Sequence, residues 1–134
     1  MSQLVESAAT TAITQPEQAV VIVTSAALQT QGMAMVLSRA MQEQGVELSI
    51  LLCDQAAELA IQSYQSSSAL APKGMKPEGL LQQIIDAGAT VAVCALFLPN
   101  SNYQEQDLRQ GVSVAQPAKM AEMLRCANSK VITF

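Results

Sequence analysis

The residue of this chain best placed to do chemistry is a cysteine at the end of an apolar segment. Residues 90–94 read Thr-Val-Ala-Val-Cys, so Cys94 stands at the C-terminal end of a predicted buried strand. In open parallel α/β sheets, ligands bind at that edge. A thiolate there can act as a nucleophile. Free cysteine is also among the most buried residue types, so a packed, unreactive Cys94 is the alternative that stays open.

The two other cysteines are weaker candidates. Cys53 ends the second predicted strand and directly precedes Asp54, whose negative charge would raise the pKa of the thiol. Cys126 lies near the end of the last predicted helix, where the helix dipole disfavours a thiolate. We therefore expect Cys53 to be a packed small residue and neither cysteine to carry the chemistry.

The chain contains no histidine, and this excludes several kinds of active site. A Ser-His-Asp triad, a Cys-His dyad and a histidine-ligated zinc site all need one. Three separated cysteines make a poor metal site, and the phosphate-binding patterns GxGxxG and GxxxxGK(S/T) are missing. We therefore expect neither a metal nor a cofactor, which leaves a reactive thiol or a binding pocket.

The composition indicates one domain with little surface charge. A chain of 134 residues can bury a core of its own. Half of the residues are hydrophobic (50%) and only 13% are charged, so we expect part of the surface to be buried in a homo-oligomer. The net charge of −4 and the scattering of the seven basic residues argue against nucleic acid as a partner.

The sequence also predicts where the protein works. No apolar stretch reaches the roughly 18 residues that a membrane span needs, and a secretory signal pattern is not seen. Three cysteines far apart are typical of a reducing compartment. We expect a cytoplasmic protein that does not contact the membrane.

Strands and helices are expected to alternate along the chain. Residues 1–18 lack periodicity and are expected to form a flexible tail, whereas residues 19–134 form one domain. Strands are expected at residues 20–23, 46–53, 90–94, 111–115 and 130–134. Four helices are expected, each with an apolar stripe that faces inward, and a further short helix is expected at residues 103–109. In chain order, the four stripes are Met33, Val36, Leu37, Ala40 and Met41 in the first helix; Ala57, Ala60, Ile61 and Tyr64 in the second; Leu81, Ile84 and Ile85 in the third; and Met120, Ala121 and Leu124 in the fourth. This pattern predicts a three-layer α/β/α domain with a mostly parallel five-stranded sheet.

One connection is unusually long for a compact domain. Residues 65–76 are rich in serine and interrupt the alternation. The segment is either a solvated insert or a binding loop at the same sheet edge as Cys94, where Lys73 and Lys76 would favour a thiolate. We expect it to be the most mobile internal segment.

The order of four segments carries a family resemblance. Residues 50–60, 88–94, 107–112 and 130–134 follow one another in a way that resembles the DsrE/DsrF group, also called YchN-like proteins. The resemblance covers about residues 19–134. Its most specific parts are the strand-end Cys94 and the later Leu108, Gly111 and Val112.

The resemblance implies a flavodoxin-like α/β/α fold, assembly into trimers or hexamers, and sulfur-carrier or sulfurtransferase activity. In the sulfur-relay members the strand-end cysteine, here Cys94, carries sulfur as a persulfide and exchanges it with sulfur-donor or sulfur-acceptor proteins. Relay subunits follow their cysteine with small and basic residues, whereas residues 95–99 here read Ala-Leu-Phe-Leu-Pro. That departure keeps a second hypothesis open, a non-catalytic structural or small-ligand-binding oligomer of the same fold.

Overall fold

A parallel sheet forms the middle layer of the molecule. The computed structural model describes residues 17–134, so the predicted tail lies outside the described residues except for its last two positions, and Gln18 already belongs to a strand. The strands are β1 (Gln18–Val23), β2 (Glu47–Leu52), β3 (Thr90–Val93), β4 (Val112–Val114) and β5 (Ser129–Thr133). They pair in the order β4-β3-β2-β1-β5, all in parallel.

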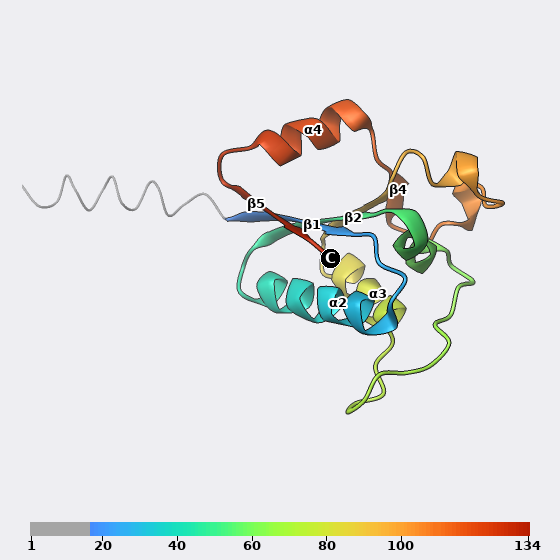
Figure 1. The fold of residues 1–134 in the computed structure, drawn as a ribbon. Coiled ribbons are helices and arrows are strands. Elements are labelled where there is room, and N and C mark those ends of the chain that lie inside the picture. The colour runs from blue at the N-terminus through green and yellow to red at the C-terminus, as the bar shows by residue number, and fades with distance from the viewer. Residues whose placement is uncertain (1–16) are drawn as a thin grey trace, which may run out of the picture.

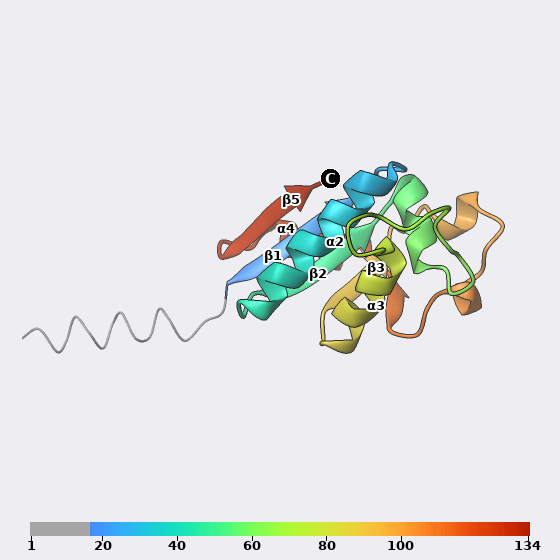
Figure 2. The ribbon, with the colours of Figure 1, turned by 90° about the horizontal axis from the view of Figure 1, so that it is seen from below.

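Helices cover both faces of this sheet. Helices α2 (Leu28–Glu43) and α3 (Pro77–Asp86) lie on one face, and α4 (Pro117–Arg125) lies on the other (Figure 1). Seen from below, α2 and α3 lie side by side in front of the strands (Figure 2). The predicted three-layer α/β/α architecture with a five-stranded, mostly parallel sheet is confirmed.

The hydrophobic core lies between the sheet and the α2/α3 layer. In each central strand every second residue points into it, because side chains alternate between the two faces of a strand. Val21, Ile50, Leu52 and Val93 belong to one hydrophobic cluster with Ile84 of α3, and all five side chains are almost completely buried.

The inward stripe predicted for α2 is wrong for three of its residues. Met33, Val36 and Leu37 are 49%, 41% and 40% exposed. The helix instead buries a face that includes Gly32 and Ser38, and a Cβ at Gly32 would overlap the side chain of Leu70. Hydrophobic periodicity favours the most apolar stripe, whereas close packing against a neighbouring side chain such as Leu70 selects a small residue.

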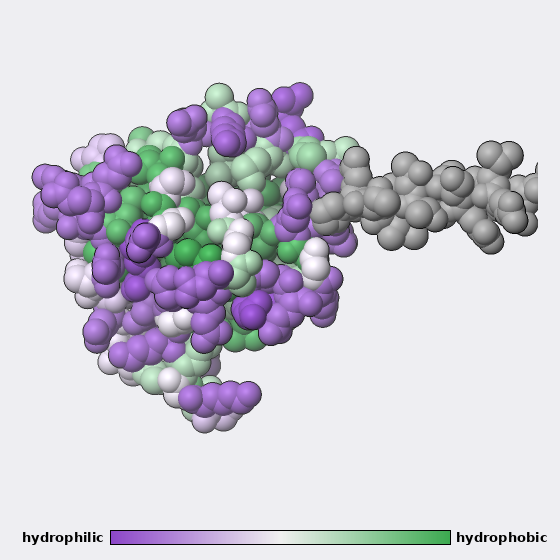
Figure 3. Space-filling view, turned by 180° about the vertical axis from the view of Figure 1, so that it is seen from behind, coloured by the Kyte–Doolittle hydropathy of each residue, from purple (hydrophilic) through white to green (hydrophobic). Residues whose placement is uncertain are grey.

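The inward stripe predicted for α4 is also wrong. The helix has no buried residue, Ala121 is exposed, and Leu124 is 40% exposed. A helix about 10 Å wide covers about half of a five-stranded sheet that is about 19 Å across. Viewed from the β4 side, hydrophobic residues remain at the surface between α4 at the top and the elements below it (Figure 3).

Three short 3-10 helices lie on the connections that follow β2 and β3: η1 (Asp54–Ala60), η2 (Leu98–Asn100) and η3 (Glu105–Asp107). Two of them replace longer predicted helices. Of the apolar side predicted for the helix after Asp54, Ala57, Ala60 and Ile61 are buried as expected, and Tyr64 is half-buried. The helix predicted at residues 103–109 is only a single turn, closed by hydrogen bonds between Gln104 and Asp107.

Candidate functional site

Two cysteines lie next to each other at the carboxyl edge of the sheet. The last register pair between β2 and β3 joins Leu52 and Val93, so Cys53 and Cys94 follow at equivalent positions. The ladder continues past both strands, because the Cys94 N–H donates to the Leu52 carbonyl at 2.9 Å and the Cys53 N–H donates to the Val23 carbonyl at 2.9 Å. The backbone that carries both thiols is therefore held by the same hydrogen bonds as the sheet.

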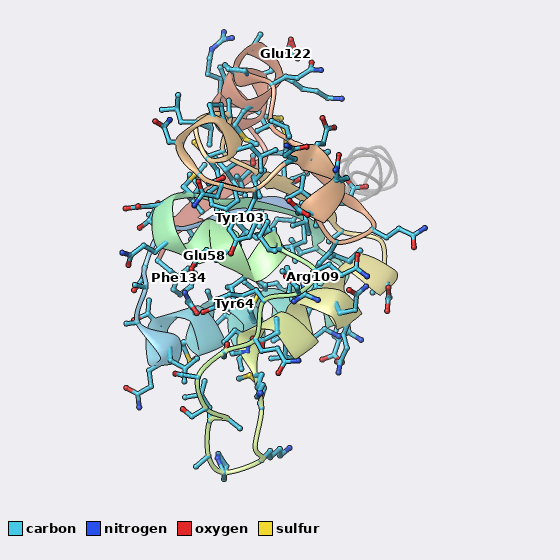
Figure 4. The ribbon with its side chains drawn as sticks, turned by 90° about the vertical axis from the view of Figure 1, so that its right-hand side faces the viewer. Glu58, Tyr64, Tyr103, Arg109, Glu122 and Phe134 are labelled. Carbon is cyan, nitrogen blue, oxygen red and sulfur yellow. The ribbon has the colours of Figure 1, made fainter. Side chains whose placement is uncertain are left out.

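A cavity of about 870 Å³ opens beside the two thiols. Its lining comes from the ends of β2 and β3, from the start of α2, from η1, and from the segment between β3 and η3. Figure 4 looks onto this edge and shows Glu58, Tyr64 and Tyr103 around η1. The rings of Phe97 and Tyr103 lie 6.1 Å apart between centroids, at 34°. The lining residues are Ala26, Gln31, Cys53, Asp54, Gln55, Glu58, Tyr64, Cys94, Leu96, Phe97, Asn100, Ser101, Asn102 and Tyr103.

Cys94 is half-buried in the wall of this cavity. The chain turns immediately after it, and the Phe97 N–H donates to the Cys94 carbonyl at 3.0 Å. This turn carries the Phe97 side chain to the cavity wall beside the thiol. Cys94 therefore faces a space that a small molecule can enter.

Cys53 was expected to be a packed residue apart from the chemistry, and the structure places it beside Cys94. Burial, the neighbouring Cys94 and the negative charge of Asp54 together raise the pKa of Cys53 to about 11. The effect expected of Asp54 is thus present, but it is the smallest of these contributions. The proximity of the two thiols was missed because it depends on strand order.

Cys126 lies apart from this site. It is exposed at the C-terminal end of α4, and its S–H donates to the Asn128 side-chain oxygen at 2.8 Å. The chain enters β5 directly afterwards, so Cys126 lies at the opposite end of the sheet from Cys94 (Figure 1).

The Ser-rich segment at residues 65–76 does not border the cavity. None of its described residues lines the cavity, so Lys73 and Lys76 are not beside Cys94, contrary to expectation. The segment runs along the outer side of α2 and α3 (Figures 1 and 2). It is held there by Ser66, whose backbone N–H and hydroxyl both donate to the buried carboxylate of Glu78.

The Leu108, Gly111 and Val112 motif supports the site from outside. Leu108 is buried and pairs with Ile61, and a Cβ at Gly111 would lie 2.7 Å from Ile85. Between them, the backbone N–H of Arg109 donates to the Ala60 carbonyl at 2.8 Å, and its Nε donates to the Leu59 carbonyl at 2.8 Å. These contacts fix the C-terminal end of η1, which forms one wall of the cavity.

The described residues, 17–134, contain no cluster of three or more histidine, cysteine, aspartate or glutamate side chains able to hold a metal ion. The same part of the chain has no helix with both the length and the apolar character needed to cross a membrane.

Comparison with known proteins finds likeness in structure only. No family model matches the sequence, and no curated protein matches it either. The YchN protein from Escherichia coli superimposes with a TM-score of 0.69 at 16% identity, over 90% of this chain and 100% of that one. MTH1491 from Methanobacterium thermoautotrophicum, a protein of unknown function, gives a TM-score of 0.68 at 12% identity, over 88% and 99%. The chain therefore has the DsrE-like fold of YchN, as the resemblance implied.

Proposed function

We propose that this protein is a sulfur carrier in which Cys94 accepts sulfur as a persulfide and passes it to an acceptor thiol. The observation that carries the proposal is the half-buried Cys94 thiol at the carboxyl edge of the sheet, in the wall of a cavity of about 870 Å³. The Cys94 thiolate attacks the outer sulfur of a donor persulfide, a new S–S bond forms, and the donor leaves as a thiolate. Transfer to the acceptor repeats the same exchange.

Cys53 supports this division of roles. Burial and the interactions with Cys94 and Asp54 raise its pKa to about 11, so Cys53 keeps its proton at neutral pH. The side-chain interaction with Cys94 also raises the pKa of Cys53, as expected when the Cys53 S–H donates to the Cys94 sulfur. Cys53 is then the hydrogen-bond donor of the pair, and Cys94 is the sulfur that reacts.

A second candidate is a non-catalytic oligomer that binds a small ligand in the same cavity. The cavity volume is far larger than one sulfur atom needs, and the rings of Phe97 and Tyr103 offer apolar contact. Under this hypothesis Cys94 only lines the pocket. Sulfur uptake distinguishes the two candidates.

Assembly into a trimer or hexamer is part of the proposal. The outward side chains of Met33, Val36 and Leu37 on α2 give an apolar stripe, and Leu124 of α4 and Val131 of β5 add a second apolar area. Surfaces of this kind are typical of subunit interfaces. Three free thiols fit the reducing cytoplasm, where sulfur-donor and sulfur-acceptor proteins would be the partners.

The test is sulfur uptake by the folded protein. Wild type and single cysteine variants are treated with inorganic polysulfide, and the mass of the intact chain is measured at once. We expect wild type and the control Cys126→Ser to gain one sulfur atom, which peptide mapping places on Cys94, and Cys94→Ser to gain none. Cys94→Ser should lower the free energy of unfolding by only about 1 kcal/mol, because the side chains are similar in size. Equal uptake by Cys94→Ser would favour the ligand-binding candidate.

A further inference from the structure

The carboxyl edge of the sheet holds two thiols, and sulfur transfer through Cys94 uses only one of them. Cys53 and Cys94 occupy equivalent positions on neighbouring parallel strands, since each follows one member of the pair Leu52 and Val93. Adjacent strands lie about 4.8 Å apart, which is inside the Cα separation of about 4.4–6.8 Å that a disulfide requires. Side chains alternate along a strand, so both thiols point to the same side.

The two side chains also influence each other. Both line the cavity beside the strand ends, and the neighbouring Cys94 is among the groups that raise the pKa of Cys53. A persulfide formed on Cys94 would therefore have the Cys53 thiol as its nearest sulfur neighbour. A neighbouring thiol at such close range reacts far more readily than one arriving from solution.

We propose that Cys53 and Cys94 form a dithiol pair that discharges the Cys94 persulfide as hydrogen sulfide. Cys53 attacks the inner sulfur of the persulfide, the Cys53–Cys94 disulfide forms, and the outer sulfur leaves as hydrosulfide with the proton of Cys53. The sulfane sulfur gains two electrons, which the two cysteines supply on becoming a disulfide. A small thiol then restores both cysteines by exchange. This inference rests on persulfide formation at Cys94.

The surroundings of Cys53 keep the discharge slow at neutral pH. The other titratable side chains of the cavity are Asp54 and Glu58 of η1, together with Tyr64 and Tyr103, and no lysine or arginine is among the described residues that line it. None of these groups favours loss of the proton from Cys53. The pKa of Cys53 is about 11, so little of it is thiolate near neutral pH. The rate should rise about tenfold per pH unit below that value, as the thiolate fraction does.

The matched variants for the test are Cys53→Ser, which removes the second thiol, and Cys126→Ser, which removes a thiol outside the cavity. Each protein is loaded with inorganic polysulfide and freed of excess donor without added thiol. Intact mass and released sulfide are then followed over time. In wild type and Cys126→Ser, we expect the extra sulfur to disappear, with one sulfide released per disulfide formed, and peptide mapping should find Cys53 linked to Cys94.

In Cys53→Ser the extra sulfur should persist at least about ten times longer. An equal persulfide lifetime in wild type and Cys53→Ser, or sulfide release without the Cys53–Cys94 disulfide, would overturn the dithiol proposal and leave the carrier proposal standing. A lack of sulfur uptake by wild type and Cys53→Ser alike would overturn both.

Discussion

The two faces of the sheet are covered to very different degrees. Toward α2 and α3, side chains such as Leu52, Leu81 and Ile84 are completely buried, whereas on the other face no residue of α4 is itself buried and Val131 of β5 is 44% exposed. Two helices match the width of a five-stranded sheet, and one does not. The chain thus closes a core on one face of the sheet by itself and covers the other face only in part.

The largest effect on the free energy of unfolding is expected from shortening a core side chain on the α2/α3 face, and shortening a side chain on the α4 face is its comparison. Ile84→Ala removes methyl groups from the closed core and should lower the free energy of unfolding by about 2–5 kcal/mol. Leu124→Ala shortens a side chain that is already 40% exposed and should cost less than about 1 kcal/mol. Urea unfolding at low protein concentration measures both. Equal losses would contradict the view that a single chain leaves the α4 face open.

The next largest effect is expected at the contact between Ser66 and Glu78, which holds the Ser-rich segment (residues 65–76) against α3. Burial acts to raise the pKa of Glu78, but the hydrogen bonds from Ser66 and the positive charge of Lys76 outweigh it and lower the pKa below its ordinary value. A carboxylate with a lowered pKa stabilises the fold above its unfolded-state pKa and loses this contribution as the pH falls through the folded-state pKa.

Glu78→Gln should therefore lower the free energy of unfolding by about 1–3 kcal/mol at neutral pH, and by less in acid, where wild type is protonated too. Urea unfolding at several pH values tests this. Glu122→Gln on the exposed surface of α4 is the control and should change little at any pH. A loss for Glu78→Gln that stays constant into acid would show that its charge is not involved.

The smallest effect on the folding of one chain is expected on the outward stripe of α2. Val36→Asp changes a side chain that is 41% exposed, so the free energy of unfolding of the single chain should change by only about 0.5 kcal/mol. Assembly should change strongly, because a carboxylate would be buried in the interface. Light scattering should show wild type as a trimer or hexamer and Val36→Asp as smaller species, with Gln83→Asp at an exposed position of α3, outside the stripe, as the control. A monomeric wild type would contradict the assembly.

The order of strands and helices was predictable because each carries a local signal. The β-branched residues Val20, Val21 and Ile22 mark a buried strand, and the stripe of Leu81 and Ile84 marks the inner face of α3. The placement of Cys94 at a strand end follows from the apolar run before it. Lengths were less predictable: the helix expected after Asp54 is only the 3-10 helix η1, whose last carbonyls bond to Arg109, far along the chain.

The sequence by itself determined the fold class, the strand segments and the candidate residue, Cys94, to examine first. Only the tertiary structure decided which stripe of α2 faces inward, because periodicity shows that a stripe exists but not what packs against it. It also decided that Cys53 lies beside Cys94. Their contact depends on β2 and β3 being neighbours in the sheet, and strand order is set by the packing of the whole chain.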